Sequence, residues 1–172
     1  MTALDGCTIV DGNVMISDDY NGPFNLAVTN FSGIISQPSP PGTANITEFL
    51  MPQATYVRTI DLQNVPALET IYLPEVTQIS SLVLYGSSTV KVDCGSLVNA
   101  NVLNLEGFAL KYDILCIHID CAKSLHSVNF SMLAQVNSVL SISADFYAPE
   151  FDLDFPSLLN ATSISMTGNI SR

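Results

Sequence analysis

The sequence predicts an all-β fold, a parallel β-helix or leucine-rich solenoid of about seven coils that residues 1–172 form as a single domain. Short apolar pairs recur with a period in the low twenties, and a turn-permissive or small residue follows each pair by two positions. Helical periodicity is almost absent. A repeat of this length cannot bury its apolar side chains alone, so successive coils must stack into long parallel sheets.

The apolar pairs mark one strand in each coil. They are Val14/Ile16, Leu26/Val28, Ile60/Leu62, Leu82/Leu84, Leu103/Leu105, Leu140/Ile142 and Ile164/Met166. The residues two positions later are Asp18, Asn30, Asn64, Gly86, Gly107, Ala144 and Gly168. The regular steps between pairs are 22, 21 and 24 residues, and the longer steps contain insertions. We expect all seven pairs to lie in register on one stacked sheet, pointing inward.

A second motif follows about ten residues after the first. "LPEV" at 73, "DCGSLVNA" at 93 and "DFPSLLNA" at 154 each place a small residue or Pro before an apolar one, ahead of the next strand. "VKVDCGSL" at 90 and "IHIDCAKSL" at 117 match still more closely. Each coil is therefore expected to have at least two strand-bearing sides that are joined by corners.

Two segments interrupt the repeat. Residues 36–48, "SQPSPPGTANITE", are rich in turn formers and are predicted to be a loop outside the solenoid. Residues 145–156 gather aromatic side chains, namely Phe146, Tyr147, Phe151 and Phe155. These rings either pack across an insertion or stack on a sugar or a protein partner.

Charge and hydropathy exclude two classes of partner. The formal charge of −11 repels phosphate backbones, so nucleic-acid binding is not expected. No apolar run is long enough to cross a bilayer, so a membrane contact would need a lipid anchor outside this chain. The acidic pairs Asp18/Asp19 and Asp152/Asp154 lack the alternating oxygen ligands of a calcium loop, and we expect neither a metal nor a cofactor.

Five Asn-x-Ser/Thr sequons indicate a secreted glycoprotein. Their asparagines are Asn30, Asn45, Asn129, Asn160 and Asn169. Five is more than chance gives, and four cysteines also suit an oxidising compartment. Accidental sequons in Ser/Thr-rich turns are the alternative. "MTALDG" is not a signal peptide, so we expect the targeting segments of a secreted parent protein to lie outside this sequence.

The cysteine spacing predicts one disulfide. Cys94 and Cys121 occupy the same place in "VKVDCGSL" and "IHIDCAKSL", which puts them on neighbouring coils, about 5 Å apart. Cys7 lies four coils from Cys94, at roughly 20 Å, beyond the roughly 7 Å limit between bridged Cα atoms. We therefore predict the pair Cys94–Cys121, with the local pair Cys116–Cys121 as its rival.

"CTIVDGNVMI" at residues 7–16 resembles the start of the receptor L domain, the leucine-rich solenoid of insulin-receptor and EGF-receptor ectodomains. "FPSLLNATSISMTGNIS" resembles the fungal branch of that family, GPI-anchored and heavily glycosylated cell-wall organisation proteins. The resemblance implies a right-handed helix whose first coil is capped by Cys7. It also implies an extracellular protein, in the cell wall or at the cell surface. The family's capping cysteine bonds to an upstream one, which this sequence lacks, so the pairing of Cys7 stays open.

These observations favour a non-enzymatic secreted or cell-surface glycoprotein module that acts in cell-wall organisation, adhesion or ligand binding. Its partner would be a cell-wall polysaccharide or a surface protein. The alternatives are a carbohydrate-active β-helix enzyme and a receptor ectodomain fragment that binds a peptide ligand. An enzyme of that kind needs paired carboxylates, which Asp18 and Asp19 offer, but the Gly-His-Gly and Arg-x-Lys segments of a polygalacturonase-like site are absent. His118 and His126 are expected to be surface or corner residues without a special role. An ice-binding face would need Thr-x-Thr rows, which are absent.

Overall fold

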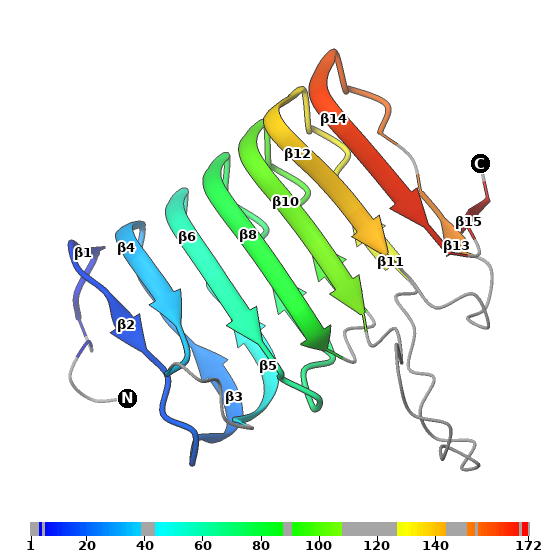
Figure 1. Ribbon diagram of the computed structural model, residues 1–172. Helices are drawn as coiled ribbons and strands as arrows, with labels where there is room; N and C mark the ends of the chain where they lie inside the picture. Colours follow the sequence, from blue (N-terminus) through cyan, green and yellow to red (C-terminus); the bar gives the residue numbers. More distant parts are fainter. Residues whose placement is uncertain are drawn as a thin grey trace, which may run out of the picture.

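The computed structural model describes residues 4, 6–38, 44–87, 91–107, 127–143, 151–153, 155–168 and 170–171. These residues form a β-solenoid in which parallel strands of successive coils lie side by side (Figure 1). No helix occurs in this part of the chain, and each of its strand pairs is parallel. The predicted all-β solenoid class is confirmed.

One long sheet has eight strands in the order β1-β4-β6-β8-β10-β12-β14, with β2 also paired to β4. Its strands are β1 (Ile9–Val10), β2 (Val14–Met15), β4 (Asn30–Ser36), β6 (Tyr56–Gln63), β8 (Gln78–Ser87), β10 (Asn99–Gly107), β12 (Gln135–Ser143) and β14 (Asn160–Thr167). Each long strand is one rung of the solenoid.

A second sheet of five strands, in the order β11-β9-β7-β5-β3, lies behind the long sheet (Figure 1). Its strands are β3 (Asn21–Asn25), β5 (Asn45–Leu50), β7 (Thr70–Tyr72), β9 (Lys91–Asp93) and β11 (Ser127–Asn129). The last rungs instead pair through a separate two-stranded sheet of β13 (Phe151–Asp152) and β15 (Ile170–Ser171). In the described residues the solenoid thus has about five complete turns, fewer than the seven expected, because only five strands complete the second sheet.

The apolar pairs from Ile60/Leu62 onward lie in register, as predicted. One inward row runs Ile60, Leu82, Leu103, Leu140, Ile164, and the other runs Leu62, Leu84, Leu105, Ile142, Met166. The first pair joins the same stack at its edge, because Val14 pairs with Ile35, which pairs with Ile60. These rows, with inward residues of the second sheet and of the corners, form the hydrophobic core.

The pair Leu26/Val28 does not lie on the long sheet, so this part of the prediction is wrong. Both side chains are buried, but they lie beyond β3, in the corner that returns the chain from the second sheet to the long sheet. There the backbone N–H of Leu26 donates to the carbonyl of Leu50 (2.9 Å). The rung of that coil is β4, whose residue in the Ile60 row is Ile35. This return corner carries its own apolar pair in later coils, for example Leu73 and Val76.

The return corners are built alike in successive coils. Between β5 and β12 they comprise residues 51–55, 73–77, 94–98 and 130–134, all of the same length. Each contains a tight turn closed by a backbone bond three residues apart, such as Leu97 N–H to the carbonyl of Cys94 (3.0 Å). In most coils two successive N–H groups then donate to one carbonyl of the coil before, as Thr55 and Tyr56 do to Thr29 (2.8 and 3.4 Å).

The first of the two interruptions is shorter than expected. Residues 45–48 belong to β5 of the second sheet and not to a loop, because Ile46 and Phe49 supply buried apolar side chains at strand positions. Residues 39–43 lie outside the described part. Of the aromatic group, Phe155 stacks on Phe130 with ring centroids 6.1 Å apart, which supports packing between coils. Phe146 and Tyr147 lie outside the described residues.

The two ends of the long sheet differ. At the first end, Asn13 lies between β1 and β2, and its Oδ1 accepts a hydrogen bond from the backbone N–H of Ile34 (2.9 Å). The Asn13 side chain thereby satisfies a backbone donor of β4 where the edge strand is interrupted between β1 and β2. At the other end, Ile164 of β14 is 53% exposed, whereas Leu140, its partner in the row, is fully buried. The inward residues of the last rung are therefore only half covered.

Candidate interaction face

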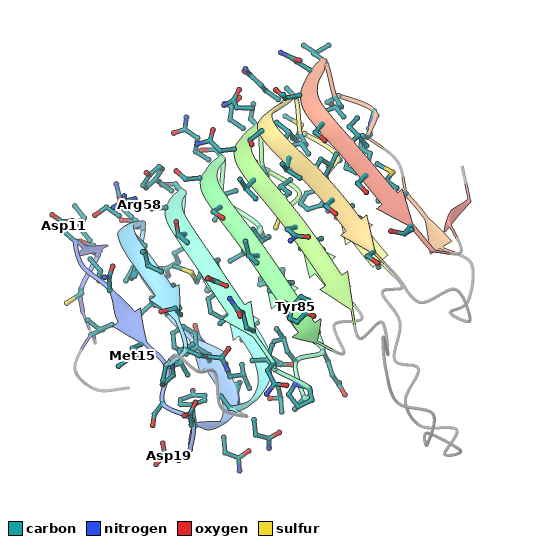
Figure 2. All side chains as sticks on the ribbon, in the orientation of Figure 1. Asp11, Met15, Asp19, Arg58 and Tyr85 are labelled. Carbon is teal, nitrogen blue, oxygen red and sulfur yellow. The ribbon has the colours of Figure 1, made fainter. Side chains whose placement is uncertain are left out.

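The outer face of the long sheet is flat and carries mostly small uncharged side chains (Figure 2). The register places them in rows along the solenoid axis. One row is Thr59, Ser81, Val102, Val139 and Ser163, and the next is Asp61, Val83, Asn104, Ser141 and Ser165. Tyr85, near the end of β8, is the large aromatic side chain of this face and is 56% exposed (Figure 2). Such a surface offers hydroxyl and amide groups to a partner and little charge.

A row of amides marks the first position of successive rungs. It consists of Asn30, Tyr56, Gln78, Asn99, Gln135 and Asn160, which are register partners from β4 to β14. Consecutive members lie about 4.8 Å apart, the spacing of paired strands. Tyr56 is the one residue of this row without an amide side chain, and it is half-buried.

The central part of this row borders a shallow groove of about 220 Å³, which we call the amide groove. Its polar lining residues are Tyr56, Gln78, Ser80, Asn99, Asn101 and Asn137. Two hydrogen bonds order this lining: Gln135 Nε2 donates to Asn137 Oδ1 (2.6 Å), and Asn137 Nδ2 donates to Asn101 Oδ1 (2.9 Å). Asn101 is the last acceptor in this series of two hydrogen bonds, so its amide nitrogen still has hydrogens to donate.

One cation lies beside the groove. Arg58 is exposed and directly follows Val57 on β6. Val57 is the register partner of Ile79, and Ile79 directly follows Gln78 of the groove. Its guanidinium projects from the start of β6, at the same end of the strands as the amide row (Figure 2). The groove is therefore neutral apart from a single positive charge on one rung, in a chain whose formal charge is −11.

Three of the four described sequons lie on strands, whose alternation explains their exposure, and the fourth begins at Asn129, the last residue of β11. The middle residue of a sequon points into the core, as Phe31, Ile46 and Phe130 do, so the asparagine and the hydroxyl residue both face outward. Asn45, Asn129 and Asn160 are exposed, and Asn30 is half-buried. Asn169 lies outside the described residues.

Two of the sequon asparagines are hydrogen-bonded to the preceding coil of the second sheet. Asn45 Nδ2 donates to Asn21 Oδ1 (2.7 Å), and Asn129 Nδ2 donates to Asp93 Oδ1 (2.9 Å). Asn30 and Asn160 instead occupy the two ends of the amide row. The outward rows through Thr59 and Asp61 contain no sequon asparagine.

The cysteines are only partly described. Cys94 is a buried free thiol, and its burial, with the nearby charge of Asp93, raises its pKa well above the ordinary range. The next coil places Phe130 at the equivalent position, since the N–H of Cys94 donates to the carbonyl of Asn129 (3.1 Å). Cys116 and Cys121 lie outside the described residues, so the pair Cys94–Cys121 stays a prediction. Cys7 is a free, half-buried thiol.

The remaining candidates do not converge on a site. Asp18 and Asp19 are exposed in the first coil, where Ser17 Oγ donates to Asp19 (Figure 2). Within the described ranges no group of three His, Cys, Asp or Glu side chains is placed to hold a metal ion, and no helix could span a membrane. His118 and His126 lie outside these ranges, as does Asp154.

The fold and its outer face define the class, a parallel β-solenoid with a flat face that carries little charge. The chain matches no family model, no curated protein and no solved structure.

Proposed function

We propose that the chain is a non-enzymatic module of a secreted or cell-surface glycoprotein, which serves cell-wall organisation or adhesion by binding a ligand on its solenoid surface. The observation that carries the proposal is the orientation of the sequons. In the sequons of β4, β5 and β14 the alternation of the strand turns the asparagine and its hydroxyl partner outward, and in the sequon that begins at Asn129 the corner buries Phe130 and exposes Ser131, so in all four a glycosyl group can be attached without disturbing the core.

The distribution of the sequons supports the ligand-binding part of the proposal. Glycans at Asn45 and Asn129 would cover the second sheet, and those at Asn30 and Asn160 would stand at opposite ends of the long sheet. The middle of the long sheet would stay bare. A flat face that is free of glycans and of most charge suits contact with a wall polymer or another surface molecule.

Expression in a eukaryotic secretory host tests the proposal. We expect treatment with an amidase that removes N-glycans to lower the mass of the secreted protein by several glycans. Asn45→Gln should remove one glycan, whereas Asn21→Gln, at the register partner outside any sequon, should remove none. An unchanged mass after amidase treatment of the wild type would contradict the assignment to the secretory pathway.

A further inference from the structure

We infer that the amide groove binds a neutral, linear polysaccharide that lies along the solenoid axis across the rungs β6 to β12. This inference rests on the proposed function and deepens it, because it names the class of ligand and the part of the surface that takes it.

The chemistry of the lining matches sugar hydroxyls. A hydroxyl both donates and accepts hydrogen bonds, and a carboxamide offers two donors and a carbonyl acceptor on one rigid plane. Gln78, Asn99 and Asn101 present three such groups in the groove. Tyr56 adds an aromatic ring, whose apolar face suits the C–H side of a pyranose, and a phenolic hydroxyl.

The groove is ordered before any ligand arrives. The hydrogen bonds from Gln135 to Asn137 and from Asn137 to Asn101 hold these amides in position across two rungs. Side chains that are already fixed lose less conformational freedom on binding, which favours affinity. Because Asn101 accepts with its Oδ1 and lines the groove, its amide hydrogens are available to a ligand.

The periodicity of the row favours a polymer over a single sugar. The first position of each rung repeats about every 4.8 Å along the axis, so a chain of repeating units can make similar contacts on successive rungs. When the units are linked, each further contact adds binding free energy without a second full loss of translational and rotational entropy. Affinity is therefore expected to rise with the number of sugar units until the groove is spanned.

The charge pattern selects a neutral chain. Arg58 supplies a positive charge on one rung only, which cannot match an acid on every sugar of a polyuronate. The overall charge of −11 repels such a polyanion further.

Calorimetric titration of the full chain, made in a bacterium that attaches no N-glycans, tests the inference. The probes are soluble β-glucan, mannan and chitin oligosaccharides of two to eight units, with oligogalacturonate as the anionic probe. We expect one neutral series to bind with an affinity that rises with length, and the anionic series to bind more weakly. The double variant Gln78→Ala/Asn101→Ala should weaken binding at least tenfold. The control Asn25→Ala/Gln53→Ala removes two exposed amides outside the groove and should bind as the wild type does.

Circular dichroism first establishes that each variant is folded. Failure of all three neutral series to bind the folded wild type would overturn the inference. An equal loss in the control variant would do so as well, and so would tighter binding of oligogalacturonate. Because this protein carries no glycans, its result is independent of the mass measurement, and either proposal can fail while the other stands.

Discussion

Replacing an inward residue of the long sheet with alanine should cost far more in the middle of the stack than at its end. Leu103 and Ile164 lie in the same inward row, with Leu140 between them. Leu103 is fully buried, so Leu103→Ala removes the transfer free energy of its side chain and leaves a cavity, a loss of about 2–5 kcal/mol in the free energy of unfolding. Ile164 is 53% exposed, so less than half of the roughly 1.5–3 kcal/mol for full burial is at stake, about 1 kcal/mol, with no closed cavity.

Urea unfolding followed by circular dichroism measures both losses. The unfolding is repeated at several protein concentrations, and the slopes of the transitions are compared. Repeat proteins can unfold in more than one step, and a changed slope would reveal it. Ser163→Ala, an exposed outward position beside Ile164, serves as the control and should change stability by less than about 0.5 kcal/mol. Equal losses for Leu103→Ala and Ile164→Ala would refute the reasoning, since the last rung would then be covered in solution.

Gly33→Ala should destabilise the first rungs by about 1–3 kcal/mol in a thermal melt, because the added Cβ would lie 1.8 Å from the backbone oxygen of Gly12; a wild-type melting temperature would contradict this close approach. Asn64 has a φ of 55°, so Asn64→Val should cost about 1–2 kcal/mol in urea unfolding while Asn64→Gly stays near the wild type. In the reduced protein, iodoacetamide at neutral pH should modify Cys7 in the folded state before Cys94, which is buried and whose pKa is raised. Above about pH 8.5 the reduced unfolded chain releases the Cys94 proton while the reduced folded chain keeps it, so stability under reducing conditions should fall as pH rises, and Cys94→Ala should flatten that fall.

The fold class was predictable because the inward rows repeat at nearly constant steps, as the register of Ile60, Leu82 and Leu103 confirms. The misplacement of Leu26/Val28 has a physical cause. Each coil contains two apolar series, one in the rung and one in the return corner, and both repeat with the length of the coil. Periodicity alone cannot distinguish the two series. In addition, the proline-rich segment after Ser36 made β4 difficult to recognise as the rung of that coil.

The outward orientation of the described sequons agrees with their sequence, since a strand that buries its middle residue must expose both neighbours. The amide groove was missed because its members are far apart in the sequence and belong to no motif. A signal does exist: Tyr56, Gln78 and Asn99 each stand four residues before the first residue of the apolar pair of their rung. Gln135 stands five residues before Leu140, because the register of β12 shifts between Val136 and Val139, and no feature of the sequence predicts this shift.

The constant length of the return corners has a consequence for how this scaffold can change. The opposite connections differ widely, since residues 64–69, 88–90 and 108–126 join the long sheet to the second sheet in consecutive coils. Leu103 and Leu140 nevertheless stay register partners across the longest of them. Between β5 and β12, insertions and deletions thus occur on one side of the coil and not on the other. A foreign peptide could be inserted at the exposed Pro66 without shifting any rung as long as Val65 and Leu68 keep their buried positions, whereas one extra residue in 73–77 would turn the inward side of the next strand outward.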